Sequence, residues 1–417
     1  MKIRISKAQI VDERHPDNGK KRDILIENGK ITKIAATITT PVDRVIEGAG
    51  LCVSIGWMDM RANFRDPGDE HKEDLESGLK AAAQGGFTAV ALMPSTNPAV
   101  DNKGAVEYLL NRSRTNKVEV VPIGAVSKKL SGESLAEMYD MHMAGAKAFS
   151  DDKHSLTESG MLHRALLYTK NFDATVIHFP YDSSLIPNGQ INEGVQSTQL
   201  GLKGIPAIAE EMMVDRDITL LQYTEGKLHL GPVSSALSIK HVASAKKDGL
   251  HITCETTAAH LAYSEEVLDG FDSNYKLLPP LRSEKNRKEL IKLLKAGKID
   301  VISSDHSPED EEHKKLEFDY ANFGTAGIET FFPLLYNAVG ETMELDKLIA
   351  TFSINPRRIL GMPIPEIKEG VKANLTLFST VQKTNFSRKE LKTKGYNVAE
   401  VGREMNGKVL GTISTSR

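Results

Sequence analysis

The feature that most constrains the fold is a repeated alternation of short apolar runs with amphipathic helical patterns through the middle of the chain. The apolar runs lie at 89–93, 118–123, 144–149, 174–178, 227–230, 251–253 and 300–303. The helical patterns lie at 73–84, 102–114, 134–143, 159–168, 234–247 and 283–296. Buried strands that alternate with amphipathic helices indicate parallel βαβ units. Roughly seven or eight such units predict an α/β protein with a TIM-like (β/α)8 barrel.

A doubly wound open sheet is the competing architecture for this alternation. Such sheets often bind dinucleotides through a glycine-rich turn after an early strand. No Gly-x-Gly-x-x-Gly pattern follows the early strands of this chain, which weakens a dinucleotide-binding interpretation.

Both ends of the chain look different from the middle and resemble all-β material. Strand-like runs occur at 3–10, 24–26 and 31–34, and Asn28-Gly29 between the last two is typical of a hairpin turn. Two further runs occur near the C-terminus, at 375–378 and 409–413. We therefore predict two domains. Residues 1–53 plus 366–417 form a composite β-sandwich domain, and residues 54–365 form the barrel.

Charge and composition exclude several classes of function. The 417 residues carry a net charge of −3, so no basic excess exists to bind a nucleic acid. No run of about 18 apolar residues suggests a membrane span, and the first residues lack the apolar core of a signal peptide. The 2 cysteines are too few for a disulfide scaffold. We expect a cytoplasmic protein that binds neither a membrane nor nucleic acid.

In a (β/α)8 barrel the chemistry takes place at the C-terminal ends of the strands. Polar and ionisable residues follow nearly every predicted strand of this chain. They are Arg61, Asn63, Arg65, Ser95, Asn97, Asp151, Asp152, His178, His229, Glu255, His260, Asp305 and His306. The sequence therefore predicts a site at this end of the barrel.

The segments that carry these residues resemble one family. The segment 56–68 reads GWMDMRANFRDPG, 93–98 reads MPSTNP, 149–152 reads FSDD, and 304–308 reads SDHSP. In this order and spacing they resemble the dihydroorotases of the cyclic amidohydrolase superfamily, over essentially the whole chain. The resemblance implies a metal-dependent barrel flanked by a small β-domain. It also implies the reversible closure of carbamoyl-aspartate to dihydroorotate in pyrimidine synthesis, with water activated by zinc.

The chain departs from the family at the metal positions. Of the six ligand positions that the resemblance implies, three keep a ligating side chain and three do not. The kept positions are Asp151 (the predicted ligand of the pair 151–152), His178 and Asp305; the lost ones are Arg61, Asn63 and Pro232. Arginine offers no lone pair, the asparagine carbonyl is a poor zinc ligand, and proline has no ligating group.

The substrate positions change as well. Arg65 matches the arginine that binds the substrate carboxylate. Ser95 stands where the family has asparagine, and Glu309 where it has histidine. The resemblance makes Asp305 the general base, here a vestigial one.

Three hypotheses remain open. In the first, the chain is a catalytically inactive dihydroorotase homologue that serves as a structural partner of aspartate transcarbamoylase, with a homodimer expected from the family. No cofactor is then expected, and the Arg61 guanidinium replaces the metal charge by pairing with Asp305 or Asp151. In the second, the chain is an active cyclic amidohydrolase that hydrolyses dihydroorotate with one zinc ion on the remaining ligands. In the third, it is a non-enzymatic assembly protein of the dihydropyrimidinase-related kind.

Overall fold

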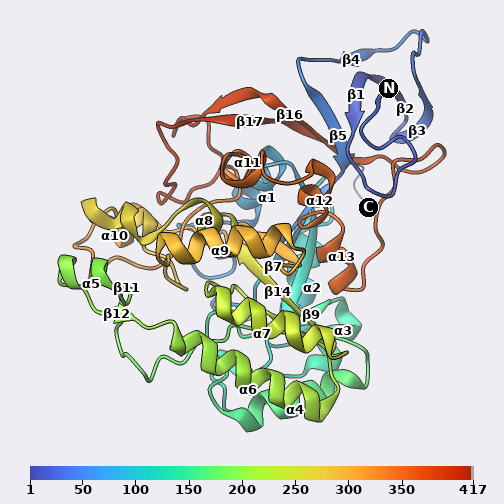
Figure 1. Cartoon of the computed structure of the whole chain (residues 1–417). Coiled ribbons are helices and arrows are strands. Elements are labelled where there is room, and N and C mark those ends of the chain that lie inside the picture. The colour runs from blue at the N-terminus through green and yellow to red at the C-terminus, as the bar shows by residue number, and fades with distance from the viewer. Residues whose placement is uncertain (415–417) are drawn as a thin grey trace.

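The computed structural model describes residues 1–414, and Figure 1 shows two bodies that share one chain. A barrel occupies the lower and larger part, and a sheet built from both ends of the chain lies above it. The strands of the barrel are β6 (Trp57–Ala62), β7 (Phe87–Leu92), β8 (Glu119–Gly124), β9 (Ala148–Phe149), β10 (Thr175–His178), β13 (Leu228–Leu230), β14 (Ile252–Thr257) and β15 (Val301–Ser303). Each predicted apolar run of the middle region overlaps one strand, namely β7, β8, β9, β10, β13, β14 or β15, although the run 144–149 shares only Ala148 and Phe149 with β9.

These eight strands form one parallel sheet in chain order, from β6 to β15. A parallel bridge between Ala62 and His306 joins the chain after β15 to the end of β6. The backbone N–H of Ser304 also donates to Asp59 on β6, at 3.1 Å. The sheet therefore curls into a nearly closed barrel, which confirms the predicted (β/α)8 architecture over an open sheet.

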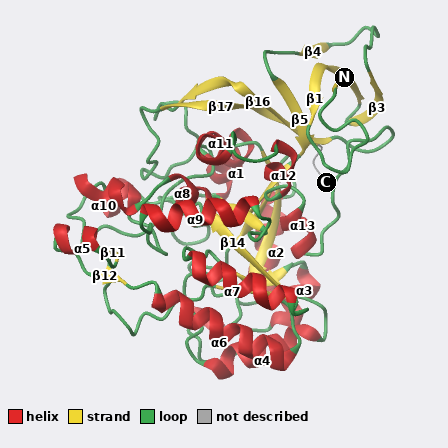
Figure 2. Cartoon of the chain, viewed as in Figure 1, coloured by secondary structure: helices red, strands yellow, loops and turns green. Residues whose placement is uncertain are grey.

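Helices surround the barrel strands, as Figure 2 shows. They are α1 (Leu75–Gln84), α2 (Lys103–Ser113), α3 (Met138–Ala144), α4 (Ser159–Lys170), α5 (Val195–Leu200), α6 (Ile208–Thr224), α7 (Ala236–Lys247), α8 (Ala258–Ala262), α9 (Glu284–Lys295), α10 (Glu311–Lys314), α11 (Phe331–Val339), α12 (Leu345–Ala350) and α13 (Asn355–Ile359). The six predicted helical patterns coincide with α1, α2, α3, α4, α7 and α9. The helices α6 and α11 were not among the predicted patterns.

The second body is a seven-stranded sheet that takes strands from both ends of the chain. They are β1 (Lys2–Ile10), β2 (Lys21–Glu27), β3 (Lys30–Ala35), β4 (Arg44–Ile46), β5 (Leu51–Ile55), β16 (Asn374–Asn385) and β17 (Glu404–Ser414). The late strand β16 pairs with the early strand β5, so the red and blue ribbons of Figure 1 meet in one sheet. The turn between β2 and β3 has positive φ at Asn28 and Gly29, as the Asn-Gly pair predicts.

The domain boundaries at 53/54 and 365/366 stay a prediction, and residues 415–417 of the expected composite domain lie outside the described residues. A separate two-stranded pair, β11 (Ile191–Asn192) and β12 (Gly204–Ile205), precedes α6.

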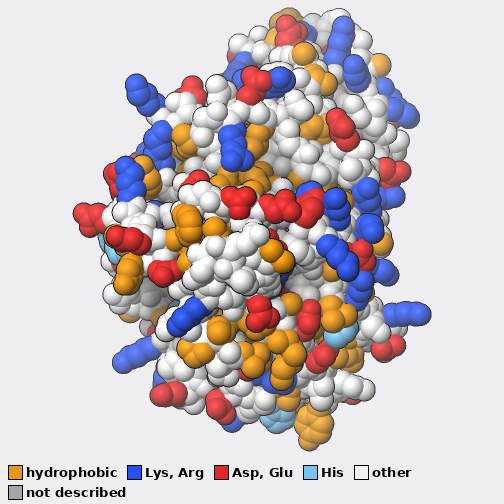
Figure 3. Space-filling model, turned by 60° about the vertical axis from the view of Figure 1, so that its left-hand side comes forward, with side chains coloured by type: hydrophobic (Ala, Val, Ile, Leu, Met, Phe, Trp, Pro, Cys, Tyr) orange, Lys and Arg blue, Asp and Glu red, His pale blue; other side chains and the backbone are white. Residues whose placement is uncertain are grey.

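The surface of the molecule is mixed in charge. On the face shown in Figure 3, Lys and Arg side chains are interspersed with Asp and Glu, and hydrophobic side chains lie between them. Among residues 1–414, no helix combines the length and the apolar composition that a membrane span needs.

Candidate functional site

Arg61 lies at the centre of the site. It is the fifth residue of β6, its side chain points into the barrel, and it is fully buried. Its Nε donates to Glu255 Oε1 at 2.5 Å, its Nη1 to Asp152 Oδ1 at 2.9 Å, and its Nη2 to the carbonyl of Gly231 at 2.8 Å. One guanidinium therefore joins the ends of β6, β9, β13 and β14. It pairs with two buried carboxylates at once, a geometry that suits the planar fork of arginine.

Asp152 is the carboxylate on which several polar groups converge. Besides Arg61, it accepts a hydrogen bond from Asn63 Nδ2 at 3.1 Å and another from the Ser95 hydroxyl. Ser95 also lies 3.0 Å from Asn63 Oδ1. Burial alone would raise the pKa of Asp152, but the nearby Arg61 and Lys153 charges outweigh burial and hold that pKa below its usual range.

Asp305 is paired with a lysine that the sequence reasoning missed. Lys153 Nζ lies 2.7 Å from Asp305 Oδ2, while Asp305 Oδ1 has no hydrogen-bond partner within residues 1–414. Burial raises the pKa of Asp305 despite the opposing effect of Lys153 and Arg61. The only signal for Lys153 in the sequence was its position directly after the Asp151-Asp152 pair.

The expected pairing of Arg61 with Asp305 or Asp151 therefore has to be corrected. Arg61 bonds Asp152 and Glu255, and Lys153 takes Asp305. The physical reason is that the carboxylates beside Arg61 are those of Glu255 on β14 and of Asp152, the residue after Asp151. The barrel end thus holds two internal cations and three acidic groups.

Asp151 itself faces away from this cluster. Its Oδ1 accepts the backbone N–H groups of Val126 and Ser127, at 2.8 and 2.9 Å, and its Oδ2 accepts the Ser127 hydroxyl. The carboxylate thereby holds the loop that follows β8. Of the Asp-Asp pair, the structure places Asp152 and not Asp151 in the barrel centre.

His178 uses both ring nitrogens for structural hydrogen bonds. Its Nδ1 lies 2.6 Å from Asp217 Oδ2, and its Nε2 accepts the backbone N–H of Leu156 at 3.0 Å. Because Nε2 accepts a hydrogen bond from an N–H group, the ring proton belongs on Nδ1, facing Asp217. Asp217 lies on α6, which the sequence patterns did not reveal.

The residues predicted as metal ligands do not fit a zinc ion as they are arranged. The Asp151 carboxylate binds backbone amides, the His178 lone pair faces an N–H group, and Asp305 binds an ammonium group. Across residues 1–414, no group of three or more His, Cys, Asp or Glu side chains is placed to hold a metal ion. At the other positions, Pro232 offers no ligand, and Arg61 and Asn63 bind Asp152.

Arg65, the predicted substrate-binding arginine, is engaged by Glu309. Arg65 Nη2 donates to Glu309 Oε1 at 2.9 Å, and Arg65 Nε donates to the carbonyl of Pro308 at 3.3 Å. Ser95, the other predicted substrate contact, forms hydrogen bonds with Asn63 and Asp152.

His229 lies on β13, is fully buried, and gives a prediction on pH. Its Nδ1 contacts Thr253 Oγ1 at 2.8 Å, and burial lowers the pKa of His229 to about 3. The unfolded chain therefore binds more protons than the folded one between pH ~3 and ~6.5. The stability linked to His229 is present above pH ~6.5 and is lost as the pH falls towards 3.

Replacing His229 with glutamine is expected to reduce the slope of the free energy of unfolding against pH. The reduction is at most the contribution of one proton, about 1.4 kcal/mol per pH unit. Urea unfolding at several pH values measures the slope. The control is His251→Gln, because His251 is exposed. Equal slopes in the two variants would contradict a neutral, buried His229.

Comparisons with known proteins agree with the fold and with the resemblance. The model of the "Dihydro-orotase-like" family matches residues 51–237, and that of the "Amidohydrolase family" matches residues 215–412. A dihydroorotase of Ruminiclostridium cellulolyticum is 39% identical over 95% of this chain and 93% of its own length. A dihydroorotase of Caldicellulosiruptor saccharolyticus is 38% identical over 98% of both chains. Among solved structures, the L-hydantoinase (dihydropyrimidinase) from Arthrobacter aurescens covers 99% of this chain and 94% of its own. It has a TM-score of 0.86 and 20% identity, which supports the fold alone.

Proposed function

The chain belongs to the dihydroorotase family of amidohydrolases, and from that premise we propose that it is a catalytically inactive member that serves as a structural partner of aspartate transcarbamoylase. Membership of this family places the chain in pyrimidine biosynthesis. The proposal also includes a homodimer as the assembly state of the chain.

The observation that carries the proposal is the position of Arg61. Amidohydrolase family members generally use zinc. Here a buried guanidinium bonds Asp152 and Glu255, and a second cation, Lys153, bonds Asp305. Two fixed positive charges at the barrel centre repel a divalent cation and offset two of the three negative charges of the acidic groups there. On this proposal the zinc site is degenerate, and the strand-end residues are kept as a salt-bridge network.

A second candidate function is hydrolysis of dihydroorotate to carbamoyl-aspartate with a remodelled, mononuclear zinc site. The observation that favours it is the name dihydroorotase on relatives that are 38–39% identical over nearly the whole chain. On this alternative Asp305 is the residue to test, because its Oδ1 has no partner within the described part of the chain.

Three measurements on one preparation separate the two candidates. Elemental mass spectrometry on protein purified without chelator or nickel is expected to find almost no zinc. Turnover of dihydroorotate and of carbamoyl-aspartate is expected to be absent. Size-exclusion chromatography of a mixture with the aspartate transcarbamoylase of the same organism is expected to give one larger complex.

Two results would overturn the proposal. One is about one zinc ion per chain together with turnover that Asp305→Asn abolishes, which supports the enzyme. The other is that the protein elutes alone while the transcarbamoylase is fully assembled and active without it. Turnover that Asp305→Asn leaves unchanged comes from a contaminating enzyme and agrees with an inactive chain.

A further inference from the structure

A second cluster of charges lies at the mouth of the barrel, apart from Arg61. Its centre is Glu309, a carboxylate that is only 3% exposed. Glu309 Oε1 accepts from Arg65 Nη2 at 2.9 Å, and Glu309 Oε2 accepts from Lys72 Nζ at 2.8 Å and from Asn322 Nδ2 at 3.0 Å. Three donors, two of them cations, therefore surround one carboxylate. We call Arg65, Lys72 and Asn322 the cradle.

The cradle places two positive charges around the single negative charge of Glu309, and Asp310 interacts with Lys72 through space. Neither Arg65 nor Lys72 forms an ion pair with any other carboxylate among residues 1–414. Both side chains are largely withdrawn from solvent, at 17% and 11% exposure. Withdrawn cations without a matching anion are unfavourable, so the carboxylate is a required part of this cluster.

The backbone on both sides of the contact is also held. Arg65 has a φ of 56°, in the left-handed region that non-glycine residues rarely adopt. The backbone N–H of Glu309 donates to Asn397 Oδ1 at 2.9 Å, and its carbonyl accepts the N–H of Tyr396 at 2.6 Å. Asn397 belongs to the segment 386–403, which leaves the terminal sheet between β16 and β17 and crosses to the barrel mouth.

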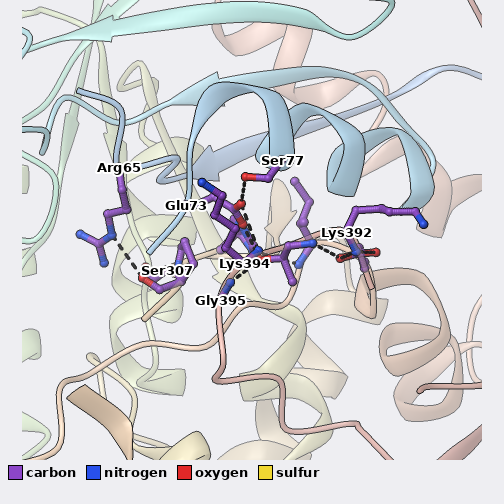
Figure 4. A network of polar contacts seen from close by, with 12 residues as sticks. Arg65, Glu73, Ser77, Ser307, Lys392, Lys394 and Gly395 are labelled. Atoms are coloured by element: carbon purple, nitrogen blue, oxygen red, sulfur yellow. Dashed lines mark hydrogen bonds and ion pairs between the residues drawn. The ribbon is translucent and has the colours of Figure 1, made fainter. Parts of the chain in front are cut away.

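More contacts fasten this segment to the chain after β6. Figure 4 shows Glu73 between Ser77 of α1 and Lys394 of the segment, with Arg65 near by. The backbone N–H of Lys394 donates to Glu73 Oε1 at 3.2 Å, and Lys394 Nζ bonds Asp74. The segment 386–403 thus meets the loop after β6 and the loop after β15 at the same place. Glu309, in the loop after β15, contacts both the segment and the loop after β6.

The resemblance already assigns a carboxylate to Arg65; we propose that in this chain Glu309 occupies that place, held also by Lys72 and Asn322, and that this internal carboxylate fastens the loop after β15 to the loop after β6. The ligand class is a small carboxylate, because a guanidinium, an ammonium and an amide donor together match the two oxygens of such a group. The inference deepens the proposed function and rests on it. A free carboxylate has to displace a tethered one, which is present at a high effective concentration.

The test removes the internal ligand and supplies an external one. Glu309→Ala leaves the cradle intact and is expected to lower Tm by roughly 3–6 °C in chloride buffer. Acetate at the same ionic strength is expected to restore at least half of the loss, in a saturable manner, because it binds only the folded state. The wild-type protein is expected to show no shift with acetate relative to chloride. Differential scanning fluorimetry measures all three.

Two variants serve as controls. Glu311→Ala removes an exposed carboxylate whose one ion pair within residues 1–414 is with Lys315, and its Tm is expected to change by less than about 1 °C. In Glu309→Ala combined with Arg65→Met, acetate is expected to restore nothing.

Three outcomes would overturn the inference. They are an unchanged Tm in Glu309→Ala, equal recovery in acetate and chloride, and recovery that persists without Arg65. If Glu309→Ala does not fold in chloride, its refolding yield in acetate decides: a yield that rises with acetate supports the site, and an unchanged yield contradicts it. These readouts involve neither zinc nor a partner protein, so their failure is distinguishable from failure of the proposed function.

Discussion

Replacing Arg61 with methionine is expected to lower the free energy of unfolding by about 3–5 kcal/mol. The guanidinium is fully buried and bonds Asp152 and Glu255. Methionine leaves Glu255 without its cation and Asp152 with only the charge of Lys153 nearby, in a medium that solvates carboxylates poorly. Urea unfolding followed by the fluorescence of the single tryptophan, which lies on the same strand, measures the change.

The matched control for this variant is Arg112→Met, which alters an exposed arginine of α2 and is expected to change stability by less than about 0.5 kcal/mol. Neutralising the two carboxylates as well, with Asp152→Asn and Glu255→Gln, is expected to return part of the loss. An Arg61→Met protein as stable as the wild type would show that the guanidinium does not compensate these carboxylates.

Replacing Trp57 with alanine is expected to lower the free energy of unfolding by about 3–5 kcal/mol. Trp57 begins β6, is fully buried, and donates its indole N–H to Ser54 at 2.9 Å. Its ring contacts Phe332, Phe352 and Phe378, with centroids 5.0 to 5.3 Å away. Phe378 lies on β16, so the lost packing joins the barrel to the terminal sheet.

Circular dichroism follows this unfolding, because the variant has no tryptophan left. Tyr223→Ala is the control: its ring is 78% exposed, and we expect a change of less than about 0.5 kcal/mol. Trp57→Phe keeps much of the volume and is expected to lose clearly less than Trp57→Ala. Equal losses in these two Trp57 variants would place the contribution in the indole hydrogen bond and not in packing.

The barrel could be predicted because its strands are continuous apolar runs, which is how strands covered on both faces look in a sequence. The helix α6 escaped the same reasoning for a physical reason. Its buried face includes Glu210 and Asp217, which bind Ser234 and His178 across the structure. A helix whose buried face contains carboxylates, hydrogen-bonded to residues distant in the sequence, does not show a continuous apolar stripe.

The position of the candidate site could be predicted from the sequence, but the pairing of its charged side chains could not. Strand-end positions follow from the barrel, so Arg61, Asp152, Glu255 and Asp305 were expected near one another. Which cation pairs with which carboxylate depends on side-chain directions at neighbouring strand ends, and local patterns do not contain that information. Lys153 is the example: it directly follows the Asp pair and reaches Asp305, which lies just after the last strand, β15.

The crossing of the segment 386–403 has a consequence for synthesis of the protein. On the ribosome, β6 to β15 emerge long before Tyr396 and Asn397, whose bonds to Glu309 complete the barrel mouth. The early strand β5 likewise waits for β16 to cover its open edge. A nascent chain therefore carries an unfinished barrel mouth and an unpaired strand edge until β16 and the segment 386–403 have been translated. Such an intermediate exposes a strand edge on which pairing with another chain can start.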